Sequence, residues 1–355
     1  MIRSWRPPSF WWQNELCGRE RVLAGALAPF GSLYGAVAGR RMRQPGTKAP
    51  LPVLCVGNLV VGGAGKTPMV LALAKRLLAT GESPWLLTRG YGSAAEHGPP
   101  VIVDKVAHSA LEVGDEALLL ARAAPTLASG DRVSAAHLAA RQGASVLVLD
   151  DGLQNPALEK DLKLIVVDAA AGIGNGLCLP AGPLRAPLSV QLDFASAVVI
   201  VGDGPQGAYL AERAQRAGKP VIAARLVVTS DVKAQLAHRR VYAFAGVGRP
   251  SKFFATLEEL GAEIIGTACF PDHYAYQRAD MAPLQRAAQE TDALLVTTEK
   301  DLVRLGSAAA SEDAALDPTL PTPMAVPIEM MVSDEAGLDD LVARALSRAR
   351  GKLGA

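Results

Sequence analysis

Short apolar runs recur along the chain, and longer segments with apolar residues at helical spacing separate them. The runs are rich in Val, Ile and Leu and are bounded by Gly, Pro or Asp, which is typical of strands buried in a parallel sheet. Before residue 230 they lie at residues 53–56, 84–88, 144–151, 162–167, 197–201 and 221–228. This alternation of strand and helix predicts an α/β fold with a mainly parallel sheet.

A second alternating segment follows a polar, basic connector at residues 231–240. Its apolar runs lie at residues 241–245, 293–297 and 324–331, with helical patterns at 251–260 and 338–350. The shorter extent of this segment predicts a second, smaller α/β domain.

The run at residues 53–56 leads into a glycine-rich turn and then into a helical pattern that begins at Pro68. Strand, glycine loop, Lys-Thr and helix form a P-loop, although Val60 stands where the generic pattern has Gly. Glycines let backbone N–H groups approach phosphate oxygens, and the following helix directs its positive dipole end at the same anion. The residues expected to bind nucleotide are Val61, Gly62, Gly63, Ala64, Gly65, Lys66, Thr67 and Pro68.

Acidic residues stand at two informative places. Asp150 and Asp151 end the strongest apolar run, and a strand ending in Asp downstream of a P-loop is where Mg²⁺ is held, together with the Thr67 hydroxyl. An ordinary Asp-Gly turn is the alternative interpretation. Asp115 and Glu116 open another predicted helix, where acidic residues commonly serve as caps.

Arg89 and Tyr91 follow the run at residues 84–88. They therefore lie at the carboxyl end of a predicted strand, where α/β sheets place ligands. Both are candidates to contact a phosphate or a sugar, and loop residues without such a role are the alternative.

The N-terminal 48 residues combine arginines with Trp5, Phe10, Trp11 and Trp12. Residues 22–39 form an uncharged run of about the minimum length for a membrane span, diluted by glycines and Pro29. One interpretation, which we prefer, is an interfacial anchor with tryptophans at headgroup depth and arginines towards anionic lipid. The other is a helix buried against the core.

The composition narrows the classes of function. A net charge of +1 gives no overall field that favours nucleic acid. The four cysteines form no C-x-x-C pair, which argues against a disulfide scaffold and a zinc site and suits a reducing compartment. No obligate protein partner is evident.

Several stretches together resemble the tetraacyldisaccharide 4′-kinases of lipid A biosynthesis. The matching motifs are Gly57-Asn58 with residues 62–68, then residues 89–92, 114–116, 150–154, 180–185, 244–250, 270–274 and 297–301. They follow the family's order over most of the chain, and the family's own loop accommodates Val60. Asn155 is a departure, because the family usually has His there, and Ala186 replaces a frequent Glu.

The resemblance implies ATP- and Mg²⁺-dependent phosphorylation of the 4′-hydroxyl of tetraacyldisaccharide 1-phosphate, a lipid A precursor, to give lipid IV(A). It also implies a peripheral or monotopic enzyme on the cytoplasmic face of the bacterial inner membrane, in contact with an anionic membrane surface. Asp115 would be the catalytic base, paired with His273 across the two domains, and Lys66 would neutralise charge. The implied substrate contacts are Asn58, Arg89, Tyr91 and Gln154, and the candidate metal ligands are Thr67, Glu116, Asp150 and Asp151.

The expected fold is α/β: a P-loop NTPase-like, mainly parallel sheet with flanking helices, a second smaller α/β domain and an N-terminal membrane-associated helical segment. The expected divisions are 1–48 for that segment, 49–230 for the ATP-binding domain, 241–335 for the smaller domain with Phe-Pro-Asp-His-Tyr, and 336–355 for a C-terminal helix. The alternative function is a P-loop switch that hydrolyses nucleotide to drive partner or metal transfer. Metal delivery would require a Cys/His cluster, which the sequence does not show.

Overall fold

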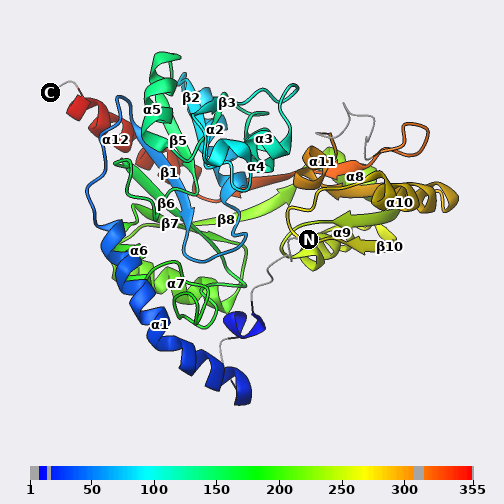
Figure 1. Ribbon diagram of the computed structural model, residues 1–355, viewed down its shortest axis with the longest axis horizontal. Coiled ribbons are helices and arrows are strands. Elements are labelled where there is room, and N and C mark those ends of the chain that lie inside the picture. Colours follow the sequence, from blue (N-terminus) through cyan, green and yellow to red (C-terminus); the bar gives the residue numbers. More distant parts are fainter. Residues whose placement is uncertain (1–7, 14–16, 307–315, 354–355) are drawn as a thin grey trace.

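The computed structural model describes residues 8–13, 17–306 and 316–353, and these form two lobes built on separate sheets (Figure 1). The large lobe carries the sheet that the first set of apolar runs predicts. The small lobe lies beside it and carries the second set. The predicted α/β class with a large and a small sheet is confirmed.

In the described residues the large sheet has nine strands in the order β13-β8-β7-β6-β1-β5-β2-β4-β3. Their bounds are β1 (Val53–Asn58), β2 (Pro84–Thr88), β3 (Val101–Ile102), β4 (Thr126–Ala128), β5 (Val146–Asp150), β6 (Leu162–Asp168), β7 (Ala197–Val201), β8 (Val221–Val228) and β13 (Ile328–Val332). All pair in parallel except the two edge strands, β3 and β13. Strand β1 lies between β5 and β6, so the loop that follows it emerges beside the carboxyl ends of both neighbours.

Helices cover both faces of this sheet. They are α2 (Lys66–Ala79), α3 (Ala110–Val113), α4 (Asp115–Leu120), α5 (Arg132–Arg141), α6 (Leu188–Phe194), α7 (Pro205–Arg216) and α12 (Glu335–Leu353). Met69, Leu73 and Leu77 of α2 are buried in one core with Val342 and Leu346 of α12. This packing fixes the start of α2 under the loop after β1.

The small lobe contains a parallel sheet in the order β10-β9-β11-β12. Its elements are α8 (Ser230–Leu236), β9 (Arg240–Ala245), α9 (Pro250–Glu259), β10 (Glu263–Cys269), α10 (Arg278–Glu290), β11 (Leu294–Thr298), α11 (Glu299–Gly306) and β12 (Met324–Val326). The basic connector expected at residues 231–240 therefore contains a helix, whose Leu236 packs into this lobe.

The single strand predicted over residues 324–331 is wrong. The chain forms β12 in the small sheet, passes Pro327, and then forms β13, which pairs antiparallel with β8 in the large sheet. Proline lacks the N–H that a continuous ladder requires, so the strand divides there. Strand β13 and the helix that follows it, at residues 335–353, pack with the large lobe, although residues up to 335 were expected in the smaller domain.

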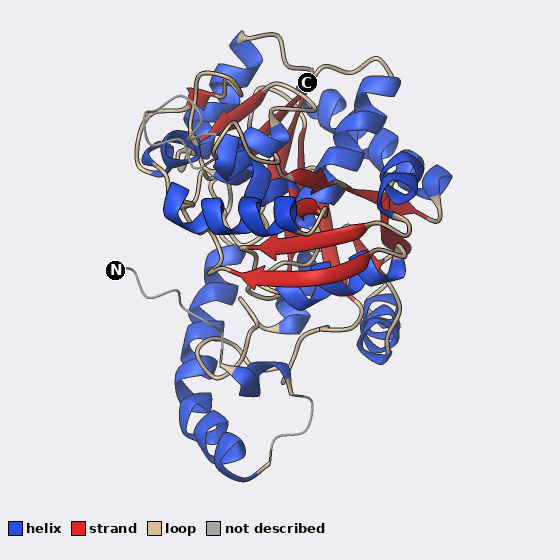
Figure 2. Ribbon diagram, turned by 90° about the vertical axis from the view of Figure 1, so that its right-hand side faces the viewer, coloured by secondary structure: helices blue, strands red, loops and turns tan. Residues whose placement is uncertain are grey.

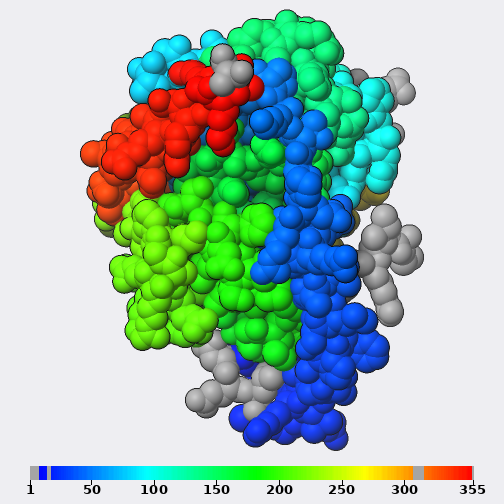
Figure 3. Space-filling model, turned by 90° about the vertical axis from the view of Figure 1, so that its left-hand side faces the viewer, coloured from blue at the N-terminus to red at the C-terminus, as the bar shows by residue number. Residues whose placement is uncertain are grey.

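An N-terminal helix, α1 (Gly18–Met42), lies along the large lobe and extends beyond it (Figures 2 and 3). Gly31, Gly35 and Gly39 form its buried face; a Cβ at Gly31 would lie 2.8 Å from the Cys178 carbonyl oxygen. Its other faces expose Val22, Leu23, Phe30, Leu33, Tyr34 and Val37. The helix is long and apolar enough to span a membrane, judged by length and composition alone.

The aromatic residues before this helix do not all behave as expected. In the short helix η1 (Ser9–Trp12), Phe10 and Trp11 are buried, and the Trp11 indole N–H donates to the Pro180 carbonyl at 3.0 Å. Placement of Trp11 at lipid headgroup depth is therefore wrong, because this side chain fixes η1 to the protein. Trp5 lies outside the described residues.

We expect Gly31→Ala to destabilise the protein by about 1–3 kcal/mol, because its Cβ would press on the backbone at Cys178. Gly25→Ala is the matched control on the same helix, since a Cβ there meets nothing within 4 Å. Helix propensity should make that change neutral or stabilising by up to about 1 kcal/mol. Denaturant titration in detergent measures both, and equal effects would contradict the close packing.

Candidate functional site

The phosphate loop connects β1 to α2 and depends on glycine. Gly62 has φ +108° and Gly65, at the N-cap of α2, has φ +88°, a region that only glycine enters readily. Asn58, fully buried at the end of β1, donates from Nδ2 to the Gly62 carbonyl at 3.0 Å. The loop is thus shaped for an anion at a helix N-terminus.

Lys66 and Arg185 both contact Asp151. Lys66 Nζ lies 3.4 Å from Asp151 Oδ2, and Arg185 Nη1 donates to both carboxylate oxygens, at 2.8 and 3.0 Å. Burial favours protonation of Asp151, but these two cations outweigh it and hold its pKa below the usual range. Asp151 also has φ +58°, a strained value of the kind found at functional sites.

Thr67 and Asp150 form a second pair beneath the loop. The Thr67 hydroxyl donates to Asp150 Oδ2 at 3.0 Å, while the buried Oδ1 has no partner among the described residues. Burial, reinforced by the negative charge of Glu116, raises the pKa of Asp150 to about 7. A buried carboxylate oxygen without a partner, beside a hydroxyl, is a donor set that suits a hard divalent cation.

The described residues contain no group of three or more His, Cys, Asp or Glu side chains that could hold a metal by themselves. Mg²⁺ usually takes one or two protein ligands and completes its shell with phosphates and water. Thr67 and Asp150 therefore fit Mg²⁺ as a partial site.

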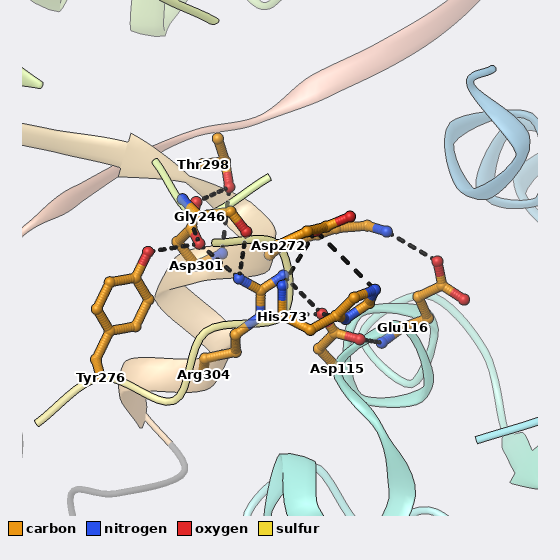
Figure 4. A network of polar contacts seen from close by, with 10 residues as sticks. Asp115, Glu116, Gly246, Asp272, His273, Tyr276, Thr298, Asp301 and Arg304 are labelled. Carbon is orange, nitrogen blue, oxygen red and sulfur yellow. Dashed lines mark hydrogen bonds and ion pairs between the residues drawn. The ribbon is translucent and has the colours of Figure 1, made fainter. Parts of the chain in front are cut away.

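Asp115, the first residue of α4, is contacted by two side chains of the small lobe (Figure 4). Its Oδ2 lies 3.1 Å from His273 Nδ1 and accepts bonds from Arg304 Nε and Nη2 at 3.0 and 2.8 Å. His273 follows β10 and has φ +57°, another strained value. The contact expected between Asp115 and His273 is confirmed, and α4 here meets the small lobe.

Arg304 is the centre of this contact and lies on α11. It is 7% exposed, and its Nη1 donates to Asp301 Oδ1 and to the Gly246 carbonyl at 2.7 and 2.8 Å. Asp301 also accepts the Tyr276 hydroxyl at 2.7 Å (Figure 4). Within its own lobe, Arg304 is therefore held by the Asp301 carboxylate and the Gly246 carbonyl, while Nε and Nη2 bind Asp115 of the large lobe.

A parallel ion pair lies next to it. Lys300, also on α11, donates to Glu116 of α4 at 2.8 Å. Glu116 therefore forms an ion pair with Lys300, a contact that was not expected for a candidate metal ligand. Two successive acidic residues of α4 face two cations of α11, which fixes how the lobes meet.

The electrostatics of Asp115 follow from this arrangement. Burial would raise the pKa of Asp115, but the hydrogen bond from His273 and the charges of Lys300 and Arg304 dominate and hold it well below the usual range. The same hydrogen bond raises the pKa of His273 above its ordinary value. Asp115 is thus ionised at neutral pH and able to accept a hydrogen bond.

The expected substrate contacts fall into two groups. Gln154 is held inside the site, since its Nε2 donates to the Asn58 carbonyl and to Gln191 at 2.8 and 2.9 Å. Arg89 and Tyr91 are exposed: Arg89 pairs with Glu96, and the Tyr91 ring lies 6.2 Å from the His273 ring. Tyr91 therefore stands beside the Asp115–His273 pair.

Sequence reasoning missed Arg304, Lys300 and Arg185 as parts of the site. A signal for Arg304 existed: it lies three residues after Asp301 of a matched motif, a spacing that puts both on one helix face. Arg185 ends the matched Pro-Ala-Gly-Pro-Leu-Arg stretch.

Comparison with known proteins gives consistent matches. Residues 23–347 match the family model described as LpxK, tetraacyldisaccharide-1-P 4′-kinase. A tetraacyldisaccharide 4′-kinase of Methylobacterium nodulans is 53% identical over 304 residues, which cover 86% of this chain and 88% of the relative. One of Methylorubrum extorquens is 48% identical over 344 residues, covering 97% of this chain and 100% of the relative.

A solved structure is also similar. The crystal structure of the "apo" form of LpxK from Aquifex aeolicus in complex with ATP has a TM-score of 0.70 and 28% sequence identity. The match covers 91% of this chain and 99% of that one.

Arg304→Ala should destabilise the protein strongly, because it removes the guanidinium that pairs with the buried Asp115 and Asp301 carboxylates. We expect a loss of about 3–5 kcal/mol in the free energy of unfolding. Arg278→Ala is the control: its pair with Asp317 is exposed, so it should change stability little. Urea denaturation of both variants checks this, and similar small losses would show that the buried pair contributes little.

Proposed function

The chain belongs to the tetraacyldisaccharide 4′-kinase family, and from this premise we propose how its two lobes carry out the reaction. The activity is that of a kinase of lipid A biosynthesis, acting on a tetraacyldisaccharide 1-phosphate. The observation that carries the proposal is the contact between Asp115 of the large lobe and His273 of the small lobe, within the matched residues. Glu116, next to Asp115, acts through its charge on Asp150, the partner of Thr67 in the phosphate loop, which supports a single site.

ATP is the phosphoryl donor, as the ATP complex of the Aquifex relative supports. The amides of residues 61–68 and the Lys66 ammonium bind its phosphates. Lys66 would then divide its charge between Asp151 and the nucleotide, and Arg185 keeps Asp151 paired when it does so.

Thr67 and Asp150 are the residues that we propose hold Mg²⁺, on the grounds of the buried Asp150 oxygen that lacks a partner. The ion would neutralise charge on the phosphates. Asp151 and Glu116, the other two candidates, are each paired with a cation, which favours Asp150.

In the transfer, the 4′-hydroxyl oxygen forms a bond to the terminal phosphorus of ATP and the bond to the ADP oxygen breaks. The hydroxyl proton passes to the Asp115 carboxylate, and His273 shares it through their hydrogen bond. Arg304 keeps Asp115 ionised and oriented before the hydroxyl arrives. Tyr91, Arg89, Gln154 and Asn58 remain our candidates for contacts with the sugar.

The substrate's acyl chains lie in a bilayer, and the exposed apolar side chains of α1 suit that setting. We propose that α1 associates with the cytoplasmic face of the inner membrane through Phe30, Leu33 and their exposed neighbours. Exposed arginines at both ends of the helix, including Arg19 and Arg40, would favour anionic lipid.

The proposed reaction predicts that the protein, given ATP, magnesium and tetraacyldisaccharide 1-phosphate, adds one phosphate at the 4′-oxygen. Lys66→Ala should lower kcat by about 100- to 1,000-fold, because a charge on the phosphates is lost. Lys75→Ala, an exposed lysine on the same helix, should have no effect. Mapping of the labelled product checks the position; ATP hydrolysis without lipid phosphorylation would favour a nucleotide-driven switch instead.

Asp115 and His273 should act as one unit. Asp115→Ala and His273→Ala should each lower kcat strongly, and the double variant should be little worse than the more damaged single variant. His238→Asn, at another positive-φ histidine of the small lobe, is the control and should leave kcat unchanged. Steady-state kinetics decides: losses that multiply in the double variant would count against a shared proton.

Membrane association should weaken when the exposed face of α1 is made polar. Phe30→Asp and Leu33→Asp should each reduce binding to anionic vesicles by about 10-fold or more, since each replaces an apolar side chain that would insert into the lipid. Leu111→Asp is the control, because this residue is at least as exposed as Phe30 and Leu33 and lies on the large lobe outside α1. Co-sedimentation measures all three, and equal binding would refute the assignment.

A further inference from the structure

The lobes also meet at the phosphate loop itself, away from Asp115. Arg249 stands at the N-cap of α9 in the small lobe, after the Phe-Ala-Gly-Val-Gly stretch. Its Nη2 donates to the Gly63 carbonyl at 3.0 Å and to Asp168 Oδ2 at 2.9 Å. Gly63 lies inside the phosphate loop, and Asp168 ends β6, the strand beside β1. A small-lobe guanidinium is therefore held against the loop that binds phosphate.

Asp168 is built to hold this cation in place. Its Oδ1 accepts the backbone N–H groups of Ala170 and Ala171 at 3.0 and 3.2 Å, and the residue is 7% exposed. Lys252, one turn further along α9, contacts the same Oδ2 at 3.1 Å. Two cations thus share one carboxylate, so this corner of the site has an excess of positive charge.

Arg249 keeps donors for a further ligand. Both of its contacts use Nη2, and no partner of Nε or Nη1 is found among the described residues. Its side chain is 47% exposed. Because a guanidinium presents five N–H groups in a planar fork, it can keep Asp168 on one nitrogen and bind a phosphate oxygen with another.

The loop's neighbouring cations are already engaged. Lys66 and Arg185 both contact Asp151. A nucleoside triphosphate brings several negative charges to the loop, so a cation that is held nearby but not fully neutralised has the most to contribute.

We propose that Arg249 is a nucleotide-binding residue supplied by the small lobe, which donates to the polyphosphate of ATP while Asp168 positions it. Lys252 assists only by sharing Asp168. The inference rests on the proposed function for the identity of the nucleotide. If Arg249 binds ATP, the ATP site is complete only when α9 of the small lobe contacts the phosphate loop.

The test is direct binding of ATP with magnesium to the full-length protein, without glycolipid. Arg249→Ala should weaken ATP binding by about 10- to 100-fold, the loss expected for a charge-assisted hydrogen bond. Arg249→Lys should recover part of it, since an ammonium keeps the charge but lacks the fork. Arg286→Ala is the control, because this arginine is exposed on α10 of the same lobe, and its ATP affinity should stay within about 3-fold of the parent.

Asp168→Asn tests the positioning role. It should weaken ATP binding by less than Arg249→Ala does. In the Arg249→Ala background it should cause no further loss of affinity, because Asp168 acts only by positioning Arg249. Thermal unfolding of each variant separates this from a loss of structure. An Asp168→Asn effect that persists without Arg249 would overturn the positioning role.

Equal ATP affinity for Arg249→Ala and Arg286→Ala would overturn the inference and leave Arg249 with a structural role between the lobes. The two proposals fail separately. If the parent phosphorylates the glycolipid but Arg249→Ala binds ATP normally, only this inference fails. If ATP binding depends on Arg249 but no glycolipid is phosphorylated, only the proposed function fails.

Discussion

A buried ion pair, between the Asp115 carboxylate of the large lobe and the Arg304 guanidinium of the small lobe, is the contact on which the site depends. Charges removed from water cost several kcal/mol each unless they are paired and hydrogen-bonded, and here both conditions are met. Because Arg304 needs Asp301 as well as Asp115, the small lobe presents its cation only in a fixed orientation. His273 reaches the same carboxylate oxygen, so one contact both joins the lobes and orients the carboxylate that we propose as the proton acceptor.

The rest of the geometry follows from strand order. Placing β1 between β5 and β6 brings the phosphate loop beside Asp150 and Asp151 on one side and Asp168 on the other. Cations then come from separate segments: Lys66 from the start of α2, Arg185 from the proline-rich stretch and Arg249 from the small lobe. Each is paired with a carboxylate, which holds the positive charge of the site in fixed positions. Asp151 and His273 of the site both have positive φ, and such strained backbone is common where a side chain must be held in one direction.

Much of this could be predicted from local sequence. The phosphate loop and the apolar runs of β1, β2, β5, β7 and β8 are set by residues close together in the chain, and their positions agree with the structure. The pairing of Asp115 with His273 came only through family resemblance, because the two lie 158 residues apart. Short or half-exposed strands were not predicted, because β3 and β4 have few residues and β10 has many partly exposed positions. Arg304 and Trp11 escaped for another reason, since a buried arginine or a fixed tryptophan depends on a distant partner that no local pattern contains.

Strand β13 has a consequence for the order in which the protein is made. Among the described strands it pairs with β8 alone, yet the whole small lobe separates the two along the chain (Figure 1). On the ribosome, the edge beyond β8 therefore stays open until the small lobe has been synthesised, and α12 cannot cover α2 before then. The large core is therefore completed only after β13 and α12, which follow the small lobe in the chain, have been made.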